Sequence, residues 1–288
     1  MSVRNQSSQF VAPWLATTIV LGAGAVAIIG LVIPPVLFAH PHQAPVLTPL
    51  GGTIIALSGY LILAWLTNTP FSAVFLRWPS PAAIRGLLVG LTPPVVVLLS
   101  LVVFDEGSFL IADRPLVLAV LSGAAVGLWT ATVEEILVRG YVLGFLGRRW
   151  EWSWAILATA LLFGVLHHGH GVGPLASGLY MAVTTAAGVS MGVLTVRYQS
   201  VWPAVGFHAG WNTIFSEHLL AVGTAPDSSR ALIRYAPQPE SWLWGGQTTA
   251  VSESPFVLVL LLTLAIWLWW RWTAGSASRP DSATTTTR

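Results

Sequence analysis

The stretch "ATVEEILVRG", residues 131–140, places two glutamates and an arginine inside an apolar run that extends from residue 115 to 147. A run of this kind predicts a membrane-spanning helix, because a bilayer is crossed by roughly 20 predominantly apolar residues. Ionisable side chains at such depth cost a few kcal/mol each and usually face a partner or a cavity. Glu134, Glu135 and Arg139 therefore call for a structural or a functional explanation.

The whole chain has the composition of an integral membrane protein. Of its 288 residues 55% are hydrophobic and only 8% are charged, and its mean hydropathy is +0.73. A soluble domain carries about 25% charged residues. The chain has no cysteine, which excludes disulfides and thiolate chemistry. The formal net charge of +2, spread along the sequence, does not favour a nucleic-acid partner.

The apolar runs predict an all-α fold, a polytopic bundle of about eight transmembrane helices. We expect one integral-membrane domain over residues 1–274, followed by a disordered polar tail at 275–288. A polar loop is predicted at 222–253. The expected spans are residues 14–38, 49–66, 84–104, 115–147, 153–168, 174–197, 201–221 and 254–273.

The arginines predict the orientation of this bundle in the cell membrane. With an even number of spans both termini lie on the same side, and most arginines fall on that side. Because cytoplasmic loops carry the excess of basic residues, we expect both termini to be cytoplasmic. The arginines assigned to that side are Arg4, Arg77, Arg85, Arg148, Arg149, Arg197, Arg271, Arg279 and Arg288, against Arg114, Arg230 and Arg234 on the other.

The three ionisable residues of the opening stretch divide into a pair and a single group. Glu135 and Arg139 are spaced i, i+4 with the acid first, the favourable order for an ion pair on a helix. Glu134 points about 100° away around the same helix and has no partner within its own span. The alternative is that all three form one structural polar cluster.

Two other predicted spans bring polar side chains to a comparable depth. His167 lies in "LLFGVLHHGH", and "VGFHAGWNTI" contains His208 and Asn212 on one helical face. Gly206 and Gly210 bracket His208, a GxxxG spacing that allows a neighbouring helix to approach closely. A carboxylate, two imidazoles and a carboxamide are therefore expected near one another.

These motifs carry a resemblance to a known family. Glu134-Glu135-x-x-x-Arg139, Phe163-x-x-x-His167 and His208-x-x-x-Asn212 stand in the order and spacing found in the CAAX protease and bacteriocin-processing (CPBP, or Abi) intramembrane proteases. That family includes the type II CAAX prenyl endopeptidase, and the similar region covers roughly residues 115–220. The resemblance implies that Glu134 and His167 activate a water and that His208 and Asn212 stabilise the oxyanion. Glu135 and Arg139 match supporting positions.

The residue chemistry agrees with this implication. Peptide hydrolysis needs a nucleophile, a base and an oxyanion site, and without cysteine or a G-x-S-x-G motif the nucleophile is expected to be water. A carboxylate among apolar helices suits the general base. The favoured scheme requires no cofactor. In the alternative scheme Glu134, His167 and His208 bind Zn²⁺, since a His₂Glu set is typical of catalytic zinc.

The predicted activity is thus hydrolysis of a peptide bond in a membrane-associated or lipidated protein or peptide. Two other functions remain open, a non-catalytic membrane partner or immunity protein and a proton-coupled transporter. A transporter would use intramembrane Glu and His as a proton relay, and is expected to contain paired half-repeats with broken helices. The sequence does not identify the substrate, whether it is prenylated, or the oligomeric state.

Overall fold

The computed structural model describes residues 81–104, 107–168, 173–215, 219–223, 231–238, 241 and 251–277. All of them lie within one compact unit, Pro70–Arg288. The predicted spans at 14–38 and 49–66 and the two ends of the chain lie outside the described residues. The count of eight helices and the cytoplasmic termini therefore stay predictions.

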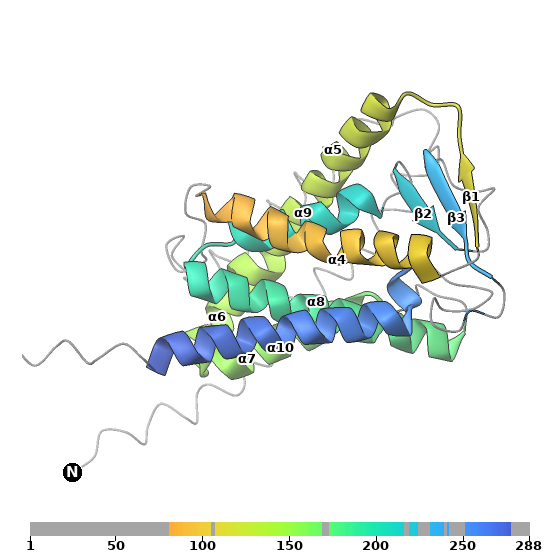
Figure 1. The fold of residues 1–288 in the computed structure, drawn as a ribbon. Helices are drawn as coiled ribbons and strands as arrows, with labels where there is room; N and C mark the ends of the chain where they lie inside the picture. The colour runs from red at the N-terminus through yellow and green to blue at the C-terminus, as the bar shows by residue number, and fades with distance from the viewer. Residues whose placement is uncertain are drawn as a thin grey trace, which may run out of the picture. The chain divides into compact units, whose positions relative to one another are not determined.

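Helices make up most of the described part of the chain (Figure 1). Four segments are long and apolar enough to cross a membrane: Ala82–Phe104, Leu116–Gly147, Pro174–Tyr198 and Pro255–Ala274. The helices and their bounds are α4 (Ala82–Phe104), α5 (Leu116–Glu135), the π-helix η4 (Ile136–Val142), α6 (Leu143–Gly147), α7 (Trp152–Leu166), α8 (Pro174–Tyr198), α9 (Trp202–Ile214), the short 3₁₀ helix η8 (Val251–Glu253) and α10 (Pro255–Ala277).

Large apolar side chains cover the outward faces of these helices. Leu88, Leu121 and Ile266, for example, expose 61%, 60% and 68% of their surface. In water such a surface would be strongly unfavourable, whereas lipid chains solvate it without cost. The exposed leucines and isoleucines therefore agree with a multi-pass membrane protein.

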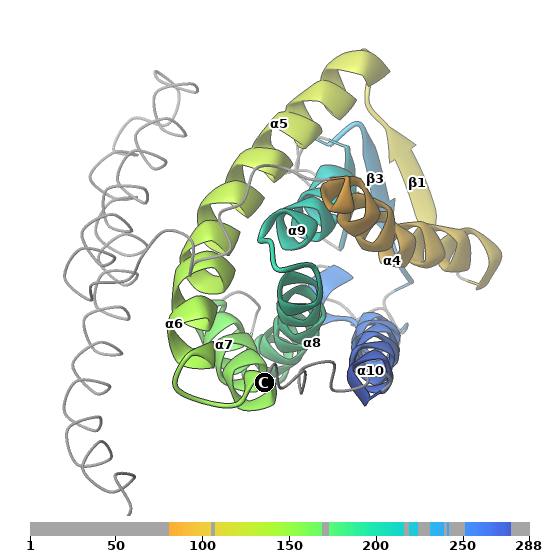
Figure 2. The same ribbon diagram turned by 90° about the vertical axis from the view of Figure 1, so that its left-hand side faces the viewer.

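Two groups of helices hold the site between them. Helix α9 packs against α4 and α5, and α8 packs against α7, α10 and α9. Figure 2 shows α9 between α5 and α4, and α8 between α7 and α10. The approach of α4 to α9 depends on small residues, because a Cβ added at Gly90 would lie 2.5 Å from the Cα of Phe207. Gly210 meets the backbone of α4 in the same way, as the GxxxG spacing around His208 predicted.

A small sheet lies at one end of this unit, and the all-α prediction did not include it. Its strand order is β1 (Ser108–Ile111), β3 (Ile233–Ala236) and β2 (Leu220–Val222). β1 runs antiparallel to β3, with Phe109 opposite Tyr235. β2 runs parallel to β3, with Ala221 opposite Arg234. The strands join segments more than 120 residues apart in the chain.

Three predicted boundaries differ from those in the structure. The span expected at 201–221 is helical only to Ile214, because Phe215 leaves the helical conformation (φ −89°, ψ 71°) and the chain pairs with β3 from Leu220. The loop expected at 222–253 contains β3 and η8. The tail expected from Gly275 begins inside α10, which continues through Ala277.

Candidate active site

The predicted ion pair of Glu135 and Arg139 is present at the junction of α5 and η4. Nη1 of Arg139 donates to Oε1 of Glu135 at 2.9 Å, and both side chains are fully buried. The π-helix begins immediately after Glu135 and contains Arg139. A π-helical turn is wider than an α-helical one and is often found at functional sites. This one places the guanidinium among the surrounding helices.

The remaining guanidinium surface of Arg139 meets an aromatic ring and a glycine. Its Cζ lies 4.1 Å from the centre of the Phe163 ring, within the range of a cation–π interaction. A Cβ at Gly188 would lie 3.1 Å from Nη2, so a glycine there makes room for the charge. Within the described residues Nε and Nη2 have no hydrogen-bond partner. The charge of Arg139 is therefore balanced mainly by Glu135 and Phe163.

His208 joins the pair from a different helix. Its Nδ1 lies 2.9 Å from the same oxygen, Oε1 of Glu135, that accepts from Arg139. Because a carboxylate only accepts, His208 Nδ1 carries the hydrogen of this bond. Glu135 therefore links η4 to α9 and fixes one edge of the His208 ring. Its second oxygen, Oε2, is buried without a hydrogen-bond partner among the described residues.

Glu134 stands apart from this pair, as predicted from its direction around the helix. Its Oε2 is buried and, in the described part of the chain, has no hydrogen-bond partner. Its carboxylate is close enough to interact electrostatically with Arg139, His208 and Tyr180. A buried carboxylate oxygen without a protein donor requires water or a ligand to satisfy it.

His167 caps the C-terminal end of α7, where the helix turns out of its regular conformation (φ −94°, ψ 7°). Its Nδ1 lies 2.7 Å from the backbone oxygen of Phe163, one turn earlier. Since a carbonyl accepts, Nδ1 is the donor, and in the neutral ring Nε2 carries the lone pair. The Phe163 ring packs against His167 at 4.4 Å and against His208 at 5.9 Å between ring centres.

A cavity of about 60 Å³ brings most of the predicted residues together. It is bordered by α7, α8, α9, η8 and α10, and His167, His208 and Asn212 all line it. Glu134 is not among the lining residues, although its carboxylate interacts with two of them, Tyr180 and His208. The remaining lining residues are Phe163, Val183, Thr184, Ala187, Met191, Phe207, Trp211, Ser252 and Leu261.

Sequence reasoning missed three contributors to this site. Phe163 was named only as a motif position without a role, and its ring contacts Arg139, His167 and His208. Tyr180 and Ser252 were not singled out, and both line the cavity. A tyrosine inside a predicted span is a weak signal for a buried polar site. Ser252 falls in a segment expected to be a loop, so nothing in the sequence pointed to it.

The zinc alternative requires three ligand side chains that lie together. Among the described residues, no three His, Asp or Glu side chains gather in a way that could hold an ion. The set Glu134, His167 and His208 is thus not assembled as the zinc alternative requires.

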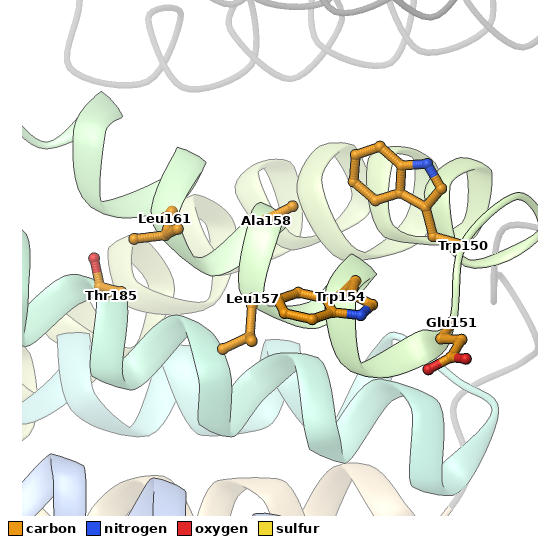
Figure 3. A pocket seen from close by; sticks show the side chains of 7 residues that line it. All are labelled: Trp150, Glu151, Trp154, Leu157, Ala158, Leu161 and Thr185. Carbon is orange, nitrogen blue, oxygen red and sulfur yellow. The ribbon is translucent and has the colours of Figure 1, made fainter. Parts of the chain in front are cut away.

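A larger hollow lies outside this site. It has a volume of about 700 Å³ and is lined by α7, the residues that precede it and Thr185 of α8. Figure 3 shows its lining side chains, of which Glu151 alone is charged. Trp154 and Leu161 there are well exposed. A surface with one carboxylate and no neighbouring base or nucleophile has the character of a lipid-facing surface rather than a catalytic one.

Comparison with known proteins agrees with the motifs. Residues 116–214 match the family described as type II CAAX prenyl endopeptidase Rce1-like. This region begins with α5 and ends with α9, so it contains Glu134, His167, His208 and Asn212. No curated protein matches the chain. The predicted resemblance is confirmed: over residues 116–214 the chain is similar to the type II CAAX prenyl endopeptidases of the CPBP proteases.

Proposed function

We propose that this protein is an intramembrane endopeptidase that hydrolyses a peptide bond of a membrane-associated or lipidated protein or peptide through an activated water. One observation carries the proposal. Oε2 of Glu134 is buried and has no hydrogen-bond partner among the described residues, and its carboxylate interacts electrostatically with His208, which lines a cavity together with His167 and Asn212. An imidazole with a lone pair and two donor side chains thus line one small space, and a carboxylate that can act as a base interacts with one of them.

The cavity has the size of a water site. A single buried water needs about 10–15 Å³ of such space, so 60 Å³ holds a few waters and no peptide. In this proposal a water at the edge of the cavity reaches Glu134 Oε2, which then takes a proton as the water attacks. The lone pair of His167 Nε2 orients the same water or shares its proton. General-base assistance of this kind is worth about 10²–10⁴-fold in rate.

His208 and Asn212 supply the second requirement of peptide hydrolysis, donors that stabilise the oxyanion. They lie one turn apart on α9 and line the same cavity. The Asn212 amide can donate directly. His208 already donates from Nδ1 to Glu135, so donation to substrate requires a hydrogen on Nε2 as well. The positive charge of that doubly protonated ring would be balanced by Glu135, and donors of this type contribute about 3–4 kcal/mol.

The charges of the cluster sum to zero in this scheme. Glu134 and Glu135 carry one negative charge each, and Arg139 and a protonated His208 carry one positive charge each. Buried ionic groups are tolerated when they are paired and hydrogen-bonded. Proton transfer from water to Glu134 leaves a net positive cluster at the moment when the substrate oxygen becomes negative. The residues therefore favour the tetrahedral intermediate electrostatically.

Substrate access requires movement of the helices that line the cavity. A peptide bond reaches the water only when two of these elements separate, as in other enzymes whose sites open and close around the substrate. We propose that the enzyme acts in the cell membrane with both termini cytoplasmic, needs no cofactor, and has a protein or peptide rather than nucleic acid as its partner.

The test is a comparison of membrane-protein termini in cells that produce the wild type, Glu134→Gln or Glu151→Gln. The last variant is a matched control, since Glu151 is an exposed carboxylate that precedes α7, at the end of the helix opposite His167. New N-termini present with the wild type and the control, and absent with Glu134→Gln, support the proposal. Identical termini in all three would reject it and favour a binding or transport function.

A further inference from the structure

Tyr180 contacts His167, the histidine at the end of α7. It lies in α8 and lines the same cavity as His167. The two rings are stacked, with centres 5.9 Å apart and planes at 20°. Phe163 packs against His167 at 52°. Two aromatic rings from two helices thus define the plane of the imidazole.

The position of His167 makes such support necessary. The residue sits where α7 ends, and its side chain is only half-buried. A histidine within a regular helix would be held by packing on both sides along the helix. From its own helix the ring is held only on one side, by the carbonyl and the ring of Phe163, and Tyr180 is a contact that α8 provides.

The hydroxyl end of the Tyr180 side chain lies near a third element, the short helix η8. The Tyr180 side chain and that of Ser252 in η8 line the same cavity and are close enough for their hydroxyls to form a hydrogen bond. This short helix is well anchored, because Ser254 is fully buried and its hydroxyl accepts from the backbone N–H of Val257 at the start of α10. Ser252 therefore holds the Tyr180 ring from a fixed position.

We propose that Tyr180, held by Ser252, is a positioning residue for His167, so that the segment leading into α10 sets the direction of the His167 lone pair. The inference rests on the proposed proteolytic function. The bond from Ser252 fixes the phenol ring, the ring fixes the imidazole plane, and the imidazole holds the attacking water. Tyr180 contacts the substrate in none of these steps.

The kinetic test uses purified protein in detergent and a quenched-fluorescent, S-farnesylated peptide as the probe. Tyr180→Leu removes the stacked ring and is expected to lower kcat about 100-fold, the cost of misplacing a reacting group by about 1 Å, with KM nearly unchanged. Tyr180→Phe and Ser252→Ala each remove one neutral hydrogen bond, so each is expected to lower kcat about threefold. Their combination is expected to be no worse than either alone.

The control is Thr185→Val on the same helix. The Thr185 hydroxyl donates only to the Met181 backbone oxygen at 2.7 Å, and the residue lies outside the cavity lining. We expect kcat within twofold of the wild type for this isosteric change. If Tyr180→Leu also stays within twofold, or if Ser252→Ala and Tyr180→Phe are additive, the proposal is wrong.

A second measurement separates this inference from the proposed function. NMR of ¹⁵N-histidine-labelled protein, with His167 assigned by His167→Gln, reports the ring tautomer without any substrate. We expect one Nδ1–H tautomer for the wild type and Tyr180→Phe, and a mixture for Tyr180→Leu. An unchanged His167 signal in Tyr180→Leu would overturn the inference. A wild type that cleaves no probe while showing the expected tautomers would count against the proteolytic function alone.

Discussion

Oε1 of Glu135 lies 2.9 Å from Nδ1 of His208, although the two residues are 73 positions apart in the chain. The same oxygen accepts from Arg139. A single atom thus joins the two halves of the candidate site, the Glu-Glu-Arg segment and α9. Glu135 is therefore expected to affect both the stability of the fold and the protonation of His208, the proposed oxyanion donor.

Glu135→Gln is expected to lower the stability of the folded protein. The change leaves the buried Arg139 charge without its carboxylate, which costs about 3–5 kcal/mol in comparable buried pairs. The double change Glu135→Gln with Arg139→Gln is expected to recover part of the loss, because it removes the stranded charge. Thermal unfolding and the yield of folded protein in detergent measure both effects. A double variant that is no more stable than Glu135→Gln would contradict the argument that Glu135 and Arg139 neutralise each other.

Phe163→Leu is expected to destabilise the protein through Arg139. A desolvated cation–π contact is worth about 2 kcal/mol, and the guanidinium lies 4.1 Å from the ring centre. A double-mutant cycle with Arg139→Gln isolates that contact from the loss of packing. We expect a coupling of at least 1 kcal/mol. Additivity within about 0.5 kcal/mol, as for residues that do not touch, would show that the ring does not balance the charge.

Gly90→Ala is expected to disrupt the contact of α4 with α9. The new methyl group would lie 2.5 Å from the Cα of Phe207, the residue before His208. Overpacking of this kind costs about 1–3 kcal/mol. Gly178→Ala is the matched control, since a Cβ there meets nothing within 4 Å and alanine favours the helix by about 1 kcal/mol. The unfolding temperature is expected to fall for Gly90→Ala and to rise for Gly178→Ala. Equal shifts in the two variants would refute the packing account.

Chelation is expected to leave the proteolytic activity intact. Using Glu134 as a ligand would leave only Glu135 as a base, and that carboxylate is bound to Arg139 and His208. Elemental analysis of the purified protein and activity after exhaustive chelation provide the measurement. About one zinc per chain, with activity lost on chelation and restored by zinc, would recast Glu134, His167 and His208 as ligands.

The features that follow from local spacing could be predicted from the sequence. The ion pair at i, i+4, the separate direction of Glu134 and the long helical run at 116–147 all depend on residues within a few turns. The glycines around His208 indicated a close helix contact, which α4 makes. The family motifs added the expectation that α5, α7 and α9 meet at one site.

The features that depend on distant partners could not be predicted. β1 is a run of four residues whose partner strand lies more than 120 positions away, so no local pattern indicates it. The π-helix after Glu135 contains the buried Arg139, and no recognisable local motif indicates it. Ser252 joins the cavity only because η8 folds against α8, in a segment whose polarity is typical of a loop.

The most direct test of the central claim compares Glu134→Gln with the wild type at equal amounts of folded protein, using the substrate that wild-type cells cleave. Glu134 Oε2 has no hydrogen-bond partner within the described residues, so the substitution removes a base without breaking an observed contact of that atom. We predict an unchanged unfolding temperature and a loss of cleavage of at least about 10³-fold, within the range for a general base. Cleavage above one tenth of the wild-type rate would contradict the assignment of Glu134 as the base.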